Sequence, residues 1–265
     1  MVKLCWENLK KIIKIIIGKT DVITFTGNYS TRNEAAKCCE GYDSDKIFEK
    51  VKKSILKVKN GEAAYERDGV LFEEKEYNFP LMTYLLMASC NKKIRVIDWG
   101  GSLGSTYFQN RSILGNDYDV KWCVIEQSHF VEFGIENLES EELIFKKKIT
   151  DIKELEEYNV VLLSSVLQYL DSEMQVLEEI CTKRPEYIII ERTPFGKERI
   201  CIQKIREPIY DASYVCKILD EKKIISFIEK NGYQLIDQWN SIQDGVIYFE
   251  NDVVYDKSLV FRRKS

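Results

Sequence analysis

The chain has 265 residues, of which 45% are hydrophobic and 31% are charged, and its formal net charge is −4. This composition is typical of a soluble globular protein and excludes long disordered stretches. Because the net charge is negative, the protein has no overall positive potential to attract nucleic acid, and we expect no nucleic-acid partner.

Cysteine and histidine usage argues against a metal site. The chain has eight cysteines and one histidine, His129. No two cysteines form a C-x-x-C pair, and the sequence therefore predicts no zinc or other metal centre. Because no signal peptide is evident, we expect reduced thiols and a cytoplasmic protein.

The first predicted element is an amphipathic helix over residues 2–17. Apolar residues recur there at helical spacing, with lysines between them. The apolar run is too short to span a bilayer. Two interpretations stay open: the helix packs on its own domain or on a partner protein, or it makes a peripheral membrane contact. In the second case the cytoplasmic protein would be membrane-associated.

Residues 1–90 are predicted to be mostly helical and to precede a second domain at 91–265. Helices are expected over 45–59, which ends at an Asn-Gly pair, and over 81–88, which Pro80 opens. Between them lies a charged cluster that contains Glu66 and Arg67. It either folds over a cleft, where it would contact a substrate, or forms a solvated surface.

After residue 93, short apolar runs alternate with helical stretches, which predicts βαβ units and a parallel sheet. The runs cover 96–98, 122–126, 160–164 and 187–191. Right-handed crossovers place the carboxyl ends of such strands at one edge, where ligands bind in open α/β sheets. We therefore expect four polar residues to share this rim: Asp98, Glu126, Ser164 and Glu191. Further strands are predicted over 233–239, 246–249 and 259–262.

The segment 95–105 reads RVIDWGGSLGS and predicts a strand, a glycine-rich turn and a helix. Glycines allow positive φ and a close approach of backbone N–H groups to a ligand. Ser102 and Ser105 occupy positions where the dinucleotide fingerprint needs glycine, and the chain has no phosphate loop. An NAD-dependent oxidoreductase is therefore a weaker interpretation. Glu126 ends the next run and is suited to accept two ribose hydroxyls.

Residues 98–104, DWGGSLG, resemble the first motif of class I S-adenosylmethionine (SAM)-dependent methyltransferases. Glu126 matches the ribose-binding acid of that class, and the segment 158–170 is similar to its fourth motif. Ser102 and Asn159 depart from the usual pattern. The resemblance implies a Rossmann-like fold: a mostly parallel seven-stranded sheet with helices on both faces, preceded by the N-terminal helical region. It also implies SAM as cofactor, S-adenosylhomocysteine (SAH) as product, and these cofactor-binding residues: Asp98, Gly100, Gly101, Ser102, Gly104, Glu126, Gln127, Asp151 and Ser164.

A narrower resemblance covers most of the chain. Segments at 25–29, 41–43, 61–68, 98–109, 124–127, 164–170 and 191–195 are similar to an uncharacterised bacterial methyltransferase family associated with surface-polysaccharide gene sets. This resemblance implies a small-molecule or glycan acceptor.

Methyl transfer to a sugar hydroxyl needs a base for the hydroxyl proton. The sequence offers as catalytic candidates His129, Glu191 and Arg192, and as substrate contacts Glu66, Arg67, Gln168, Tyr169 and Arg192. Each has a structural alternative: a packing histidine, an ion pair, a solvated charge or core packing.

Two functional hypotheses follow. The first is a SAM-dependent methyltransferase that methylates an oxygen of a sugar or glycan precursor. The alternative is a non-catalytic module of the same fold that binds a glycan-assembly partner or a membrane surface. The sequence does not determine the acceptor, the methylated atom or the oligomeric state.

Overall fold

The computed structural model describes residues 23–41, 45–205, 212–241, 246–249 and 252–264. The segment 2–17, for which an amphipathic helix is predicted, lies outside the described residues. Within them, no helix has both the length and the apolar character needed to cross a membrane.

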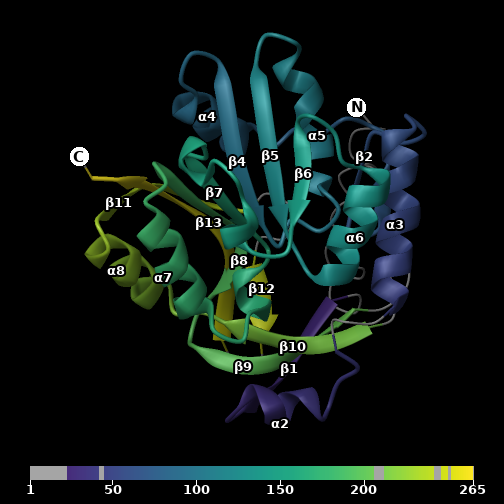
Figure 1. The fold of residues 1–265 in the computed structure, drawn as a ribbon. Helices are drawn as coiled ribbons and strands as arrows, with labels where there is room; N and C mark the ends of the chain where they lie inside the picture. The colour runs from purple at the N-terminus through teal and green to yellow at the C-terminus, as the bar shows by residue number, and fades with distance from the viewer. Residues whose placement is uncertain (1–22, 42–44, 206–211, 242–245, 250–251, 265) are drawn as a thin grey trace, which may run out of the picture.

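The central sheet has the strand order β11-β13-β8-β7-β4-β5-β6, with β12 paired to β13 (Figure 1). Neighbouring strands from β8 to β6 are parallel, and β13 is antiparallel to both of its neighbours on this path. The order reverses at β4, because the chain adds β5 and β6 on one side and then crosses to β7 on the other. This Rossmann-like arrangement has its topological switch point between β4 and β7. The strands are β4 (Lys93–Trp99), β5 (Asp119–Ile125), β6 (Leu143–Lys146), β7 (Val160–Ser164), β8 (Tyr187–Phe195), β11 (Tyr233–Asn240), β12 (Val246–Phe249) and β13 (Asp252–Arg263).

The inner strands are apolar on both faces because helices cover both sides of the sheet. Successive residues alternate between two cores: Val96 and Leu162 belong to one, whereas Ile97 and Val161 belong to the other. The first core is completed by α3 (Asp45–Lys59), α4 (Phe79–Ala88) and α6 (Ser128–Asn137), and α5 (Ser105–Leu114) lies on the same side. The second core is completed by α7 (Glu173–Lys183) and α8 (Glu221–Lys230).

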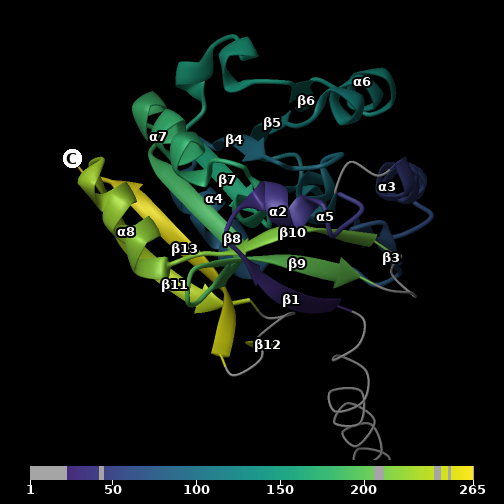
Figure 2. The same ribbon diagram turned by 90° about the horizontal axis from the view of Figure 1, so that it is seen from below.

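A second, three-stranded antiparallel sheet lies across the carboxyl ends of the central strands (Figures 1 and 2). It consists of β1 (Ile23–Tyr29), β9 (Arg199–Ile205) and β10 (Ala212–Ile218), and we call it the cap sheet. The Tyr169 hydroxyl donates to Gln203 Oε1 of β9 at 2.9 Å, and the Tyr169 ring packs edge-on against Tyr214 of β10. The cap sheet is thereby attached to the rim of the central sheet.

The chain before residue 90 is not wholly helical. It contains α2 (Arg32–Ala36), α3 and α4, but also β1 and a hairpin of β2 (Tyr65–Arg67) and β3 (Val70–Phe72). Strand β1 pairs with β9, about 175 positions later in the chain. Local periodicity does not report such a distant pairing, which is why the sequence predicts helices here and misses these strands.

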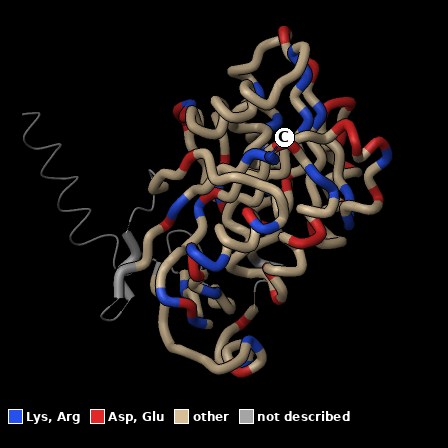
Figure 3. The backbone as a smooth tube through the Cα atoms, turned by 90° about the vertical axis from the view of Figure 1, so that its left-hand side faces the viewer, with Lys and Arg blue, Asp and Glu red and all other residues tan. Residues whose placement is uncertain are grey.

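Acidic and basic residues are interspersed along the chain, as Figure 3 shows from one side. One ion-pair group joins the cap sheet to the central domain. Lys217 Nζ of β10 lies 2.6 Å from Glu173 Oε1 of α7 and 3.0 Å from Glu198 Oε1. The Glu173 side chain is only 7% exposed, so its charge depends on this lysine.

Replacement of this lysine tests the attachment of the cap sheet. Lys217→Ala is expected to lower the free energy of unfolding by about 3 kcal/mol, because it leaves a buried carboxylate without its partner. Urea denaturation measures the change. Lys223→Ala is the matched control: its side chain is 51% exposed and pairs with Glu198, and a loss below about 1 kcal/mol is expected. Equal losses in the two variants would contradict this account.

Candidate functional site

The glycine turn after β4 requires its glycines. Gly100 and Gly104 have φ of +72° and +83°, in the left-handed region. A Cβ on Gly100 would overlap the Val166 side chain, and one on Gly101 would lie 2.5 Å from Asp98 Cγ. Ser102 also has positive φ, +54°, a conformation that costs a non-glycine residue roughly 1–3 kcal/mol. Serine thus keeps a left-handed backbone at the position where the resembled motif has glycine.

Two carboxyl groups flank this turn at adjacent strand ends. Asp98 is the penultimate residue of β4, is 1% exposed, and accepts a hydrogen bond from Trp122 Nε1 at 2.9 Å. Burial raises the pKa of Asp98 to about 7; the Trp122 bond opposes the shift, and the charge of Glu191 adds to it. Glu126 follows β5, and its Oε2 accepts from the Gln127 backbone N–H at 2.7 Å. Burial likewise raises the pKa of Glu126 to about 7.

Across the switch point, a further buried carboxyl group lies in β8, at the last residue that pairs with β7. Glu191 is 2% exposed and pairs in register with Ser164 of β7. Its Oε1 accepts from Asn78 Nδ2 at 2.8 Å, and its Oε2 accepts from Ser164 Oγ at 3.3 Å. Arg192 Nε donates to the same Ser164 Oγ at 3.2 Å. Burial raises the pKa of Glu191, whereas Asn78, Arg192 and Ser164 lower it.

The backbone beside Glu191 is strained. Ser165 and Arg192 have φ of +56° and +47°, and the Ser165 N–H donates to the Glu191 carbonyl oxygen at 2.9 Å. Left-handed non-glycine residues of this kind concentrate at binding and catalytic sites, where surrounding contacts hold them. The two strand ends therefore have the character of a site rather than of a simple sheet edge.

A cleft of about 60 Å³ opens beside this carboxyl group. It brings together three residues that the sequence singled out, Arg67, Glu191 and Arg192, although Arg67 is about 125 positions from the other two. The cleft also contains residues that sequence reasoning missed; its lining comprises Arg67, Glu76, Tyr77, Asn78, Gln109, Glu191, Arg192, Trp239, Ser241 and Ser258. Asn78 was detectable as a helix N-cap directly before Phe79-Pro80, but nothing in the sequence linked it to Glu191.

Two buried oxygens near the rim have no hydrogen-bond donor among the described residues. They are Ser241 Oγ, in the cleft lining, and Gln168 Oε1. The Gln168 amide nitrogen donates to Ser165 Oγ at 3.0 Å, so this side chain is held beside the strained backbone. Buried acceptors without a donor are costly, and a ligand hydroxyl would satisfy them.

Other predicted site residues lie outside the lining of this cleft. His129, on α6, packs edge-on against Phe48 at 4.7 Å between ring centroids. Glu66 is buried beside α5, where it accepts from Ser105 Oγ and, at 2.9 Å, from the Gly69 N–H. Asp151 is exposed and accepts from the Lys148 N–H at 3.2 Å in a short 3-10 turn. Tyr169 contacts the cap sheet. Their functional roles stay predictions.

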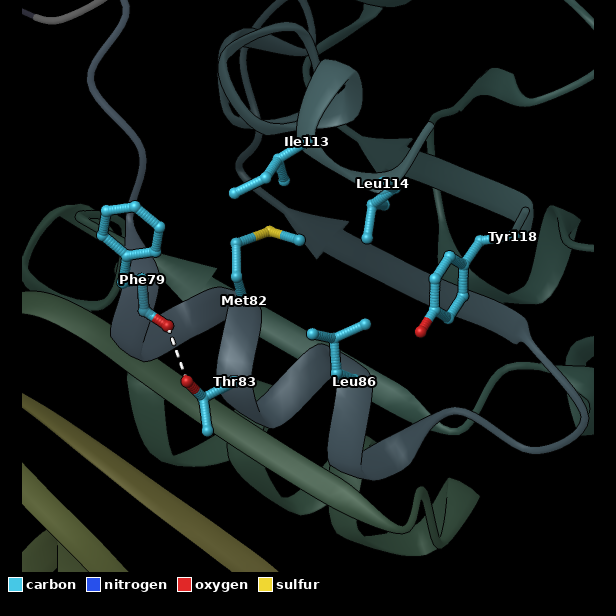
Figure 4. Close-up of a pocket in the computed structure, with 7 residues that line it drawn as sticks. All are labelled: Phe79, Met82, Thr83, Leu86, Ile113, Leu114 and Tyr118. Carbon is cyan, nitrogen blue, oxygen red and sulfur yellow. Dashed lines mark hydrogen bonds between the residues drawn. The ribbon is translucent and has the colours of Figure 1, made fainter. Parts of the chain in front are cut away.

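A larger cavity, of about 310 Å³, lies between α4 and α5 (Figure 4). Its walls are mainly apolar and carry no carboxyl group; they comprise Phe79, Met82, Thr83, Leu86, Ile113, Leu114 and Tyr118. Thr83 Oγ1 is satisfied within the helix by the Phe79 carbonyl, at 2.9 Å. Besides the Tyr118 hydroxyl, the lining therefore offers no titratable side chain. Among the described residues, no group of three or more histidine, cysteine or acidic side chains is placed to hold a metal ion.

No protein-family model matches the sequence, and a search of curated proteins finds no match. Solved structures give distant similarities. The N-terminal domain of EvdMO1, in the presence of SAH and D-fucose, aligns at 10% identity and TM-score 0.46 over 84% of this chain and 98% of that one. CcbJ methyltransferase from Streptomyces caelestis aligns at 10% identity and TM-score 0.47, over 70% and 88%.

A third structure, magnesium protoporphyrin IX methyltransferase from Synechocystis PCC 6803 with bound SAM, aligns at 11% identity and TM-score 0.44 over 70% of this chain and 77% of that one. All three similarities fall below a TM-score of 0.5. We therefore assign the fold from the strand order, and the candidate site from the contacts described above.

The buried side chain of Glu66, beside the glycine turn, should make the stability of the protein depend on pH. Burial raises the pKa of Glu66 from 4.5 to about 7, so its neutral form is favoured in the folded protein. The free energy of unfolding of the wild-type protein should therefore fall as pH rises between these two pKa values. Glutamine has no such penalty. The free energy of unfolding of Glu66→Gln, relative to that of wild type, should therefore increase by on the order of 3 kcal/mol from pH 5 to pH 8.

Urea unfolding at the two pH values measures this gain. The control is Glu49→Gln, because the Lys52 hydrogen bond lowers the pKa of Glu49. Because Glu49 titrates below the measured range, that variant should keep a nearly constant stability difference from wild type between pH 5 and pH 8. A Glu66→Gln variant with no relative gain would show that this carboxyl group is not penalised by burial.

Proposed function

We propose that this protein is a SAM-dependent methyltransferase that methylates a hydroxyl oxygen of a sugar or glycan precursor. The observation that carries the proposal is the juxtaposition of two features at the switch point. A glycine turn with left-handed backbone lies between Asp98 and Glu126, and the buried Glu191 stands across from it. A cofactor at the turn would then face a base in β8, next to the carboxyl end of β7.

The residues around the turn fit SAM. Gly100 and Gly104 supply the left-handed backbone of the turn, in which N–H groups can approach a ligand closely. Glu126 offers a partly exposed carboxylate for the ribose hydroxyls. We assign cofactor contacts to Asp98, Gly100, Gly101, Ser102, Gly104, Glu126, Gln127 and Ser164, with Asp151 at the adenine side. When bound, SAM supplies the methyl group as part of a sulfonium.

The cleft residues would handle the acceptor. Glu191 accepts the proton of the acceptor hydroxyl as its oxygen attacks the methyl group, and burial of Glu191 favours the proton-bound state that results. Arg67 and Arg192 supply donors for acceptor oxygens, and Trp239 offers an apolar wall of the kind that sugar rings pack against. Gln168 and Ser241 add acceptors for further hydroxyls. Orientation of the acceptor hydroxyl supplies much of the rate in such a displacement.

Calorimetry with SAH tests the cofactor assignment. Wild type should bind SAH and not NAD, and Glu126→Gln should weaken SAH binding at least tenfold, since a charge-assisted hydrogen bond is worth about 1.5–3 kcal/mol. Glu139→Gln, an exposed acid past α6, should bind like wild type. Failure of wild type to bind SAH at millimolar concentration would eliminate the proposal.

Transfer of a labelled methyl group from SAM to a panel of nucleotide sugars tests the chemistry. Glu191→Gln should reduce kcat by about 10²- to 10⁴-fold and leave SAH affinity within about twofold of wild type. Because burial raises the pKa of Glu191 and the base must be ionised, the wild-type rate should rise with pH through that pKa. SAH binding without transfer to any sugar would favour the non-catalytic module.

A further inference from the structure

Asn78 is the residue directly before α4, and all of its polar groups have partners. Its Nδ2 donates to Glu191 Oε1 at 2.8 Å. Its Oδ1 accepts from the Leu81 N–H at 3.1 Å, which caps α4. Its own backbone N–H donates to Asn110 Oδ1, also at 3.1 Å. One side chain thus joins the start of a helix to the buried carboxyl group of β8.

These contacts fix the orientation of the amide. Because a backbone N–H needs an acceptor, the oxygen of Asn78 must face the helix. Its NH₂ group is then directed at Glu191, and reversing the amide would lose both hydrogen bonds. Asn110 is 2% exposed, and its amide nitrogen is bonded to the Thr106 carbonyl of α5 at 2.9 Å. The anchor therefore extends to the helix that begins at the glycine turn.

We propose that Asn78 is a positioning residue that orients the Glu191 carboxylate and holds it ionised toward the cleft, an assignment that rests on the proposed function. It acts through Glu191. Two features suit Asn78 to this role. Its oxygen is committed to the helix, and its nitrogen reaches the carboxylate from a different element than β7 or β8.

Several other groups face Glu191, and their influence on its pKa has to be separated from that of Asn78. Ser164 donates from β7, the positive charges of Arg192 and Arg67 favour the carboxylate, and Asp98 opposes it from β4. Asn78 Nδ2 donates to Oε1 of this carboxyl group, whereas Ser164 Oγ donates to Oε2, so the two donors bond to different oxygens. Loss of the Asn78 NH₂ group should therefore raise the pKa of Glu191.

The chain permits a clean separation of the two roles of Asn78. Asn78→Ser keeps an N-cap of similar strength but removes the amide donor. Asn78→Ala removes both the cap and the donor. If the contact with Glu191 matters, the two variants should shift the titration of Glu191 alike. Asn78→Ala should lower the thermal midpoint of unfolding further than Asn78→Ser, because only Asn78→Ala also loses the helix cap.

The primary readout does not require turnover. Carboxyl ¹³C NMR, with Glu191→Gln to assign the resonance, follows the titration of Glu191 in each variant. We expect an upward shift of about one pKa unit in Asn78→Ser, a tenfold change in the protonation equilibrium. The pH profile of methyl transfer should move upward equally, with kcat reduced about tenfold at pH values below the pKa of Glu191 and KM for SAM unchanged.

The outcomes separate the two proposals. An unshifted Glu191 titration in Asn78→Ser, or a pH profile identical to that of wild type, overturns the role of Asn78. A shifted titration in a protein that transfers no methyl group supports the control of Glu191 by Asn78 and refutes the proposed function. A shifted titration together with a shifted rate profile supports both.

Discussion

The parallel pairing of β7 with β4 on one side and with β8 on the other is the constraint on which the site depends. It brings Asp98, Ser164 and Glu191 to one edge of the sheet and buries two carboxyl groups there. Burial alone penalises both charges, so each needs donors from outside its own strand. Trp122 supplies one for Asp98, and Asn78 and Ser164 supply them for Glu191.

The N-terminal part of the chain completes this edge. Strand β1 joins β9 and β10 in the cap sheet, the hairpin of β2 and β3 carries Arg67 to the cleft, and the start of α4 carries Asn78. The division at residue 90 thus marks a change of sequence pattern, but residues on both sides of it line the cleft. Three stretches far apart in sequence, around 67–78, 191–192 and 239–258, supply most of the walls of the cleft.

Strained backbone and an unsatisfied oxygen also occur at this edge. Ser102, Ser165 and Arg192 adopt left-handed conformations, and Gln168 Oε1 lies near them without a donor in the described part of the chain. Such costs persist when the surrounding packing enforces them, and a ligand can recover part of the cost through its own hydrogen bonds. The larger apolar cavity between α4 and α5 has none of these features, which is why volume alone does not identify the site.

The sequence by itself determined the central strands, the rim acids and the glycine turn, because each is a local pattern: a short apolar run or a turn with residue-specific φ. It also singled out Arg67, Glu191 and Arg192. Only the tertiary structure decided that Asn78 contacts Glu191, that Glu66 faces α5, and that His129 packs on Phe48. It alone also placed β1 beside β9. These contacts join residues that are distant in sequence, and the partner of such a residue is set by how elements pack, which no local spacing encodes.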